Sequence, residues 1–428
     1  MKRDDKNSIP SHFFTQIPTR EGVKNIDNQD FLCIFASTNN KKLIDMKKRL
    51  LIALVAIVGI ILAADACTSA IVSGKLTANG RPLIWKNRDT NDLNNRVERI
   101  LAHDGLMEFV ALFDARDLQD TAAWMGFNEA GFAIMNTASY NLNGNDGVKN
   151  MDREGELMRY ALERCKTVDD FENLLKTRPK PLGVEANFGV IDAQGNGAYF
   201  ETGNFKYVKF DLADAPNGIL TRTNYSYSGV KDKGMGYVRE KNEKTLLAPH
   251  IEAQDITPAV FTEELSRTFY NSLIGRDYTR SGDNWIVDQD FIPRRISTAS
   301  VVIEGVLPGE NPLLTTMWIA LGYPPCAEVY PVWVGEDGVA PELTGTTADN
   351  HSVQCDKVNK RKEEVFPVVR GNGKQYLNLS KLYNNEGTGY CQTLALKNRQ
   401  AYKRGYEEIA RRRAVFNKTK KKNKRILI

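Results

Sequence analysis

The stretch ILAADACTSAIVSG, residues 61–74, joins the end of an apolar run to a cysteine that opens a strand-like segment. Upstream, three basic residues precede the apolar run Leu50–Ala63, and Ala64-Asp65-Ala66 places small residues where signal peptidase reads them. A membrane-spanning helix needs about 20 residues, so this run is too short to span a bilayer comfortably. The sequence therefore predicts a signal peptide over residues 46–66 and a mature chain that begins at Cys67.

Cleavage after Ala66 is one of two export routes that this stretch allows. A lipoprotein signal also ends directly before a cysteine, which is then acylated. That signal usually carries a branched apolar residue at the third position before the cysteine, where this chain has Ala64. We therefore expect an exported, periplasmic or secreted protein with an uncapped Cys67, and an outer-surface lipoprotein is the alternative. Residues 1–45 follow no such pattern and are expected to be a dispensable or misassigned leader.

The formal net charge of +5 is unevenly distributed along the 428 residues. The tail from Lys397 holds thirteen basic and two acidic residues, whereas the body between Cys67 and Leu396 is acidic overall. An acidic body argues against a nucleic-acid partner. We expect one domain over residues 67–376 and a helical extension with a basic tail over residues 377–428. No stable membrane span is expected, while a lipid anchor and an oligomer stay open.

Cysteine and histidine patterns exclude several classes of site. There is no CxxC, no HExxH, no GxSxG and no nucleotide-binding fingerprint after a strand, so we expect no metal and no cofactor. The cysteines after Cys67 stay open as buried thiols or as partners in up to two disulfides; they are Cys165, Cys326, Cys355 and Cys391.

The pattern of apolar residues after Cys67 is mostly that of β-strands. Runs such as RPLIWKNRD, EFVALFDA and NFGVIDAQGNGAYFET alternate or cluster apolar residues between Asn, Asp and Gly turns, which predicts successive hairpins. One helix is predicted within GELMRYALERCKTVDDFENLLKTRP and another over FTEELSRTFYNSLI, before the strands STASVVIEGV and LTTMWIALG. The expected class is α+β, with antiparallel sheets covered by helices.

A cysteine at an uncapped N-terminus carries its own catalytic base. The α-amine has a reference pKa of about 7.7–8.0, so at neutral pH it can accept the thiol proton. Acylation of the amine would abolish this base. The alternative base is a histidine, His103 or His250, although both positions look structural.

Acyl transfer also needs an orienting group and donors for the oxyanion. Because side chains alternate across a strand, Asn87 and Asp89 share one face of WKNRD, and Lys86 and Arg88 share the other. Asp89 is a candidate for holding the α-amine. Asn224, at the end of the strand in GILTRTNYSYSG, is a candidate oxyanion donor, with a turn residue as the competing interpretation.

With these residues in view, the sequence resembles the N-terminal-nucleophile hydrolases, in the group of choloylglycine hydrolases and penicillin or isopenicillin-N acyltransferases. The motifs that carry the resemblance are Cys67-Thr68, the hairpin end Lys86-Asn87-Arg88-Asp89, GFNEAGFAIMN and TRTNYSYSG, and they cover roughly residues 67–334. The choloylglycine hydrolases have Arg where this chain has Lys86.

The resemblance implies a four-layer αββα sandwich of two antiparallel sheets and hydrolysis or acyl transfer at linear, non-peptide C–N amide bonds. It implies Cys67 as nucleophile, Asn224 as the catalytic asparagine and Arg239 as a structurally important arginine. The substrate-pocket or oxyanion residues would be Lys86, Asn87, Asn128 and one of Asn136 or Asn141. The implied partner is a small-molecule N-acyl amide, and the competing hypothesis is a lipidated binding module of the same fold.

Overall fold

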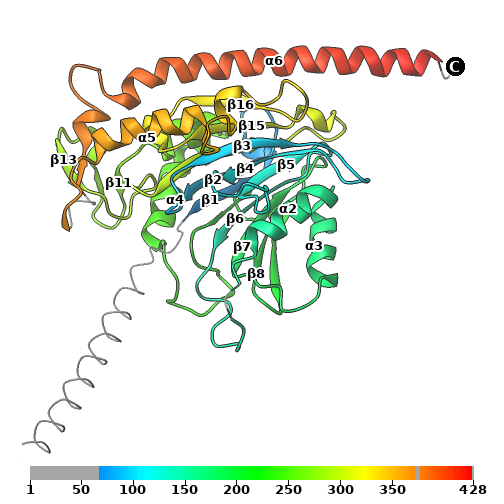
Figure 1. Cartoon of the computed structure of the whole chain (residues 1–428), viewed down its shortest axis with the longest axis horizontal. Helices are drawn as coiled ribbons and strands as arrows, with labels where there is room; N and C mark the ends of the chain where they lie inside the picture. The colour runs from blue at the N-terminus through cyan, green and yellow to red at the C-terminus, as the bar shows by residue number, and fades with distance from the viewer. Residues whose placement is uncertain (1–66, 150, 372–375, 427–428) are drawn as a thin grey trace, which may run out of the picture. The chain divides into compact units, whose positions relative to one another are not determined.

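The structure is a computed structural model that describes residues 67–149, 151–371 and 376–426 (Figure 1). The expected leader and signal peptide, residues 1–66, lie outside the described residues. The expectation of an α+β chain with two antiparallel sheets and a C-terminal helix is confirmed.

Cys67 directly precedes an inner strand, β1, of a six-stranded sheet. Its strand order is β10-β1-β2-β14-β15-β16, and every neighbouring pair is antiparallel. The strands are β1 Thr68–Val72, β2 Leu83–Asp89, β10 Ile219–Arg222, β14 Ser297–Glu304, β15 Thr316–Leu321 and β16 Val329–Val332. Because β1 lies between β2 and β10, its start meets the ends of both neighbours.

A seven-stranded sheet follows the chain order from β3 to β9, as expected for successive hairpins. Its turns use the predicted residues; Gly131, at φ +77°, sits in the turn between β5 and β6 in a conformation that disfavours a side chain. The strands are β3 Asn95–Ile100, β4 Phe109–Asp114, β5 Met125–Asn128, β6 Ala133–Ala138, β7 Ala186–Ile191, β8 Gly197–Thr202 and β9 Tyr207–Asp211.

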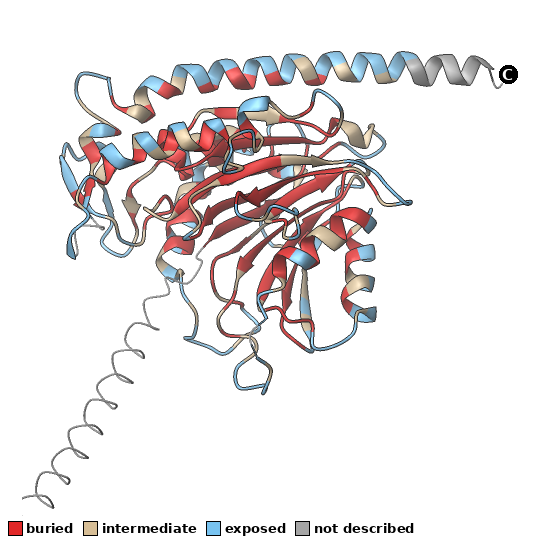
Figure 2. Ribbon diagram, viewed as in Figure 1, coloured by how far each residue is buried: buried red, intermediate tan, exposed pale blue. Residues whose placement is uncertain are grey.

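Three apolar clusters define the layers. One lies between the two sheets, where Ile71 and Ile84 meet Met135 and Ile191. A second packs α2 (Glu154–Arg164) and α3 (Val168–Thr177) against the seven-stranded sheet. The third covers the outer face of the six-stranded sheet and includes Trp318. Figure 2 shows the strands of both sheets as largely buried. The order of layers is therefore helix, sheet, sheet, helix.

The predicted single helix in GELMRYALERCKTVDDFENLLKTRP is two helices. The first ends at Arg164, and Thr167 caps the second through a reciprocal capping box with Asp170. The apolar pattern also broke there, with one stripe before Cys165 and another from Val168, so the break was readable from the sequence.

Helix α4 (Tyr237–Ala253) was not predicted. Its buried residues are almost all polar, Arg239, Glu240, Asn242 and Glu243, with Leu247 as the apolar exception. An apolar stripe is the usual sign of a helix, and here the buried face is polar instead.

The helix predicted over residues 261–274 was largely wrong. A single π-helical turn, η3 (Val260–Leu265), is followed by β11 (Tyr270–Asn271). The buried Phe269 packs edge-on against Phe291, and this contact draws the chain into an extended path.

The remaining elements flank these layers. Two short two-stranded sheets pair β11 with β12 (Arg276–Asp277) and β13 (Trp285–Val287) with β17 (Tyr376–Asn378). Helix α5 spans Val353–Val365, and α6 spans Tyr390–Ile426, with Tyr402 and Ile409 in the outer core. Among the described residues, no helix has both the length and the apolar character that a membrane crossing requires.

Candidate active site

Cys67 directly precedes β1 and is buried, with 4% of its surface exposed. The register pairs Thr68 with Asn87 near the end of β2, and Ser69 with Arg222 at the end of β10. The start of β1 and the ends of β2 and β10 therefore lie side by side at one end of the strands. The thiol lies 4.0 Å from the backbone oxygen of Asp89.

Asp89 is fully buried and accepts four hydrogen bonds. Its Oδ1 accepts from Asn87 Nδ2 at 2.9 Å and from Ser297 Oγ at 2.5 Å. Its Oδ2 accepts from Arg294 Nε at 3.0 Å and Nη2 at 2.7 Å. A carboxylate offers about four acceptor positions, so Asp89 is saturated. An α-amine bound here would have to share or replace one of these donors.

Arg294 joins the site from the segment before β14, and the sequence interpretation missed it. Burial lowers the pKa of its guanidinium, but the ion pair with Asp89 outweighs burial and raises it. The sequence signal was weak: an Arg pair, IPRRIS, before a strand-like run. Nothing local in the sequence reveals that β14 lies beside β2.

Arg239 ties Cys67 to Asn224. Its Nη1 donates to the Cys67 backbone oxygen at 2.5 Å and to Thr68 Oγ1 at 2.8 Å, and its Nη2 donates to Asn224 Oδ1 at 2.8 Å. Burial lowers the pKa of Arg239 to about 10, and the nearby charge of Arg294 acts in the same direction. Arg239 is buried, whereas Arg294 is partly exposed and its charge is paired with the Asp89 carboxylate.

Asn224 is fully buried just beyond β10. Its Nδ2 donates to the Ala138 backbone oxygen at 2.9 Å, at the end of β6. Its backbone exchanges two hydrogen bonds with Met235. Since Arg239 holds the amide oxygen, the orientation of the amide is fixed with its nitrogen as the donor. The structure therefore brings Cys67, Asp89, Asn224 and Arg239 together.

Lys86 and Asn136 connect the two sheets. The Lys86 ammonium donates to Asn136 Oδ1 at 2.8 Å and to the Trp124 backbone oxygen at 3.1 Å. Asn87 points to the opposite face of β2, where it donates to Asp89, Ser297 and the Ile292 backbone oxygen. The predicted division of faces along WKNRD is confirmed.

Comparison with protein families finds one matching model, described as "Acyl-coenzyme A:6-aminopenicillanic acid acyl-transferase", over residues 77–272. The match confirms the resemblance to the N-terminal-nucleophile hydrolases. It includes Asp89, Asn224 and Arg239, whereas Cys67 and Arg294 lie outside it. No curated protein matches the chain.

Solved structures of this group align with the chain at low identity. They include a conjugated bile acid hydrolase mutant from Clostridium perfringens, 12% identical over 62% of this chain and 92% of that one, with a TM-score of 0.38. Penicillin V acylase from Agrobacterium tumefaciens is 12% identical over 62% and 86%, with a TM-score of 0.36. The Caenorhabditis elegans ortholog of N-acylethanolamine-hydrolyzing acid amidase is 12% identical over 57% and 94%, with a TM-score of 0.34.

Asn128 makes all of its hydrogen bonds within the fold. Its Nδ2 donates to the backbone oxygens of Leu162 and Cys165, both at 2.8 Å, and its Oδ1 accepts from Ala130 and Phe132. The side chain closes its own turn and satisfies carbonyls at the C-terminus of α2. Asn141 likewise ties its loop to Ser226 and Val230.

The histidine alternatives lie among carboxylates. His250 contacts Asp255 at 2.8 Å and Glu264 at 3.2 Å, and His103 is half-exposed beside Asp104. Within the described part of the chain, the side-chain partners given for these two histidines are carboxylates. The other four described cysteines form no disulfide and are buried thiols; burial raises the pKa of Cys165 to about 12 and that of Cys355 to about 11. Such thiols are poor nucleophiles.

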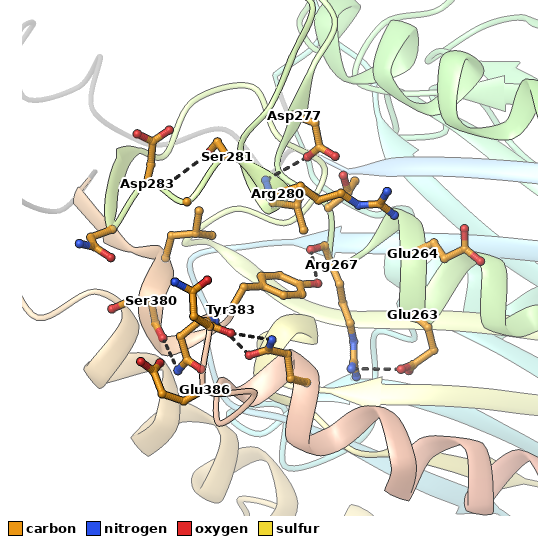
Figure 3. A pocket seen from close by; sticks show the side chains of 18 of the residues that line it. Glu263, Glu264, Arg267, Asp277, Arg280, Ser281, Asp283, Ser380, Tyr383 and Glu386 are labelled. Carbon is orange, nitrogen blue, oxygen red and sulfur yellow. Dashed lines mark hydrogen bonds and ion pairs between the residues drawn. The ribbon is translucent and has the colours of Figure 1, made fainter.

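A cavity of about 870 Å³ lies where the start of the C-terminal extension packs against η3 and the loop around η4 (Tyr278–Arg280) (Figure 3). Within its lining, Arg267 pairs with Glu263 at 3.1 Å, whereas Glu264 and Asp283 pair with residues outside it. Among the described residues, its lining includes none of the hydrogen-bond partners of Asp89 or Arg239. It is not the site built around Cys67.

Proposed function

We propose that this protein is an exported cysteine amidohydrolase or acyltransferase that cleaves linear C–N amide bonds of N-acylated small molecules. One observation carries the proposal. At the end of the sheet where β1 starts, Cys67 lies close to four polar residues, Asp89, Asn224, Arg239 and Arg294. Processing after Ala66 would expose the α-amine of Cys67 at this end of the sheet. The matched family has acyl transfer in its description.

The first step in this proposal forms the acyl-enzyme. The α-amine takes the thiol proton, and Cys67 Sγ attacks the acyl carbon. The C–N bond breaks and the leaving nitrogen takes the proton from the amine. Asn224, with its amide orientation fixed by Arg239, donates to the oxyanion. Arg239, which donates to the Cys67 backbone oxygen, supplies a positive charge near the thiolate, whereas the charge of Arg294 is paired with Asp89.

The second step resolves the acyl-enzyme. Water attacks the thioester carbon, the amine again accepts a proton, and the carboxylic acid leaves while the thiol is restored. An acceptor amine in place of water gives acyl transfer. Asp89 accepts from Arg294, Ser297 and Asn87 and so holds the two sides of the site together; to orient the α-amine it would share or exchange one of these donors.

The decisive experiment uses the exported, purified protein and its Cys67→Ser variant on a panel of acyl amides. We expect N-terminal sequencing to read Cys-Thr-Ser-Ala, and intact mass to detect an acylated wild-type enzyme. Loss of hydrolysis in Cys67→Ser with retained activity in the control Cys165→Ser supports the mechanism.

The remaining outcomes contradict the proposal. Undiminished hydrolysis by Cys67→Ser excludes the N-terminal nucleophile. A blocked first residue that incorporates labelled palmitate identifies the lipoprotein alternative, because acylation removes the base. A start elsewhere than Cys67 would overturn the account of catalysis as well.

A further inference from the structure

The backbone that carries Asn224 continues past the ladder between β1 and β10, which ends at Arg222. Asn224 itself exchanges two backbone hydrogen bonds with Met235. Because neighbouring carbonyls along an extended chain point to opposite sides, the carbonyls of Thr223 and Tyr225 face away from Met235. A buried carbonyl needs a hydrogen-bond partner, and these two carbonyls find one in the other sheet.

That partner is Asn187, a fully buried residue of β7. Its Nδ2 donates to the Thr223 oxygen at 3.2 Å and to the Tyr225 oxygen at 3.1 Å, and it also lies 3.0 Å from Thr137 Oγ1. The Ser226 hydroxyl donates to Asn187 Oδ1 at 2.5 Å, which keeps the amide nitrogen turned toward the two carbonyls. One side chain thus holds both peptide groups that flank the proposed oxyanion donor.

Glu201 stands opposite Asn187 in the register of β7 and β8 and holds the chain on either side of the donor. Its Oε1 accepts from Arg222 Nε at 2.7 Å and from the Tyr227 backbone nitrogen at 2.8 Å. Its Oε2 accepts from the Ser228 backbone nitrogen at 2.7 Å. Glu201 therefore anchors this segment before and after the donor, while Asn187 anchors it at the donor itself.

The hydrogen bonds of Asn187 suit it to support rather than to direct contact with a substrate. Among the described residues, its two amide hydrogens face three acceptors, all of them within the protein. An oxyanion donor has to lie about 2.7–3.1 Å from the developing charge. A misplacement of about 1 Å, caused by a change away from the reacting atoms, can lower the rate about 10²-fold.

We propose that Asn187 is a positioning residue, which fixes the backbone of Asn224 and so sets the distance from its amide to the oxyanion. This inference rests on the proposed function and adds a residue that acts only through Asn224. Arg239 holds the side-chain oxygen of Asn224, so the side chain and the backbone of the donor are fixed by different elements. Loss of Asn187 leaves the bond from Arg239 in place and removes the two hydrogen bonds that hold the backbone.

The test is a double-mutant cycle between Asn187→Ala and Asn224→Ala, with kcat and KM measured on the acyl-amide panel. Alone, Asn187→Ala should lower kcat about 10- to 100-fold and leave KM within about threefold of wild type, because the donor acts in the transition state. In the Asn224→Ala background the same change should lower kcat less than about twofold, because the side chain that it positions is absent. An equal fold-loss in both backgrounds overturns the inference.

The matched control is Asn398→Ala, at a fully buried asparagine of α6. Asn398 also joins two elements, since it accepts from the Val329 backbone nitrogen at 3.0 Å and donates to Glu263 Oε1 at 2.8 Å. Its loss should lower stability as the loss of Asn187 does, while kcat should equal the wild-type value.

A milder variant keeps the test decisive if Asn187→Ala does not fold. Ser226→Ala removes only the hydroxyl that orients the amide of Asn187. It should lower kcat about fivefold in the otherwise wild-type enzyme, the effect of one hydrogen bond, and leave kcat of Asn224→Ala unchanged. The same loss in both backgrounds again overturns the inference.

Hydrogen–deuterium exchange separates this inference from the proposed function, because it needs no turnover. A peptide that covers residues 219–228 should exchange faster in full-length Asn187→Ala than in wild type, and no faster in Asn398→Ala. Unchanged exchange, or a kcat of Asn187→Ala within threefold of wild type, overturns the inference and leaves the proposed function standing where hydrolysis still depends on Cys67. Faster exchange in a protein without Cys67-dependent hydrolysis rejects the proposed function and, with it, this role of Asn187.

Discussion

Asn128 and Asn224 make an instructive pair, because both are fully buried asparagines that donate to backbone oxygens. In the β5–β6 turn, all of Asn128's hydrogen-bonding capacity stabilises the fold. Beside β10, the oxygen of Asn224 is held by Arg239, which also holds the backbone of Cys67. Burial and residue type are equal in the two places, and only the partners differ.

The largest effect that would sharpen this contrast is expected at Asn224. Asn224→Ala should lower kcat by about 10²–10³, the usual cost of losing an oxyanion donor. Steady-state kinetics on the acyl-amide panel measures it, and circular dichroism checks the fold. A kcat within threefold of wild type would exclude Asn224 as the donor.

Asn128 should give the opposite result. Asn128→Ala removes the side-chain partner of two backbone carbonyls and two backbone amides, so the free energy of unfolding should fall by roughly 1–3 kcal/mol. Denaturant titration measures the loss. Activity per folded molecule should stay near the wild-type value, and a large fall in kcat without a loss of stability would return Asn128 to the catalytic pocket.

The third prediction concerns the Asp89–Arg294 pair. Arg294→Lys keeps the charge but cannot donate from two nitrogens of one rigid plane, so kcat/KM should fall about tenfold. The matched control is Arg276→Lys, at an exposed ion pair, for which no change is expected. Equal kinetics for both variants would show that Arg294 supplies only charge.

The smallest effect is expected at Glu243, one turn beyond Arg239 on α4. Among the described residues, neither of its buried carboxylate oxygens has a hydrogen-bond partner, and burial raises the pKa well above its ordinary range. The folded protein therefore holds a proton that the unfolded chain releases above its own pKa of about 4.3. Below that pH, the raised pKa of Glu243 does not change the free energy of unfolding. Above it, the free energy of unfolding falls as the pH rises toward the pKa of Glu243 in the folded protein.

Glu243→Gln should thus stabilise the protein at pH 8 and leave stability near pH 4 unchanged, as measured by denaturant titration at both values. Glu252→Gln, on an exposed position of the same helix, is the control and should change neither value. A gain that is the same at both pH values would show that Glu243 is not protonated in the folded state.

The hairpins of the seven-stranded sheet and the alternation along WKNRD were predictable, because period-2 patterning and turn residues are local signals. Helix α4 was not. It buries polar groups where a periodicity argument looks for apolar ones, so it lacks the stripe by which a helix is recognised. The Asn128 motif shows a related difficulty, since a polar residue that a turn needs looks the same in sequence as one that a substrate needs.

The sequence alone determined the strand pattern, the position of Cys67 at the start of a strand and the resemblance to the N-terminal-nucleophile hydrolases. Only the tertiary structure decided which polar groups share the site. Asp89 and Arg294 are 205 residues apart, and they meet because β14 pairs with β2 in a register that no local pattern encodes. Non-local strand pairing is set by the packing of both sheets together, so the partners of Cys67 become visible only when the sheet is assembled.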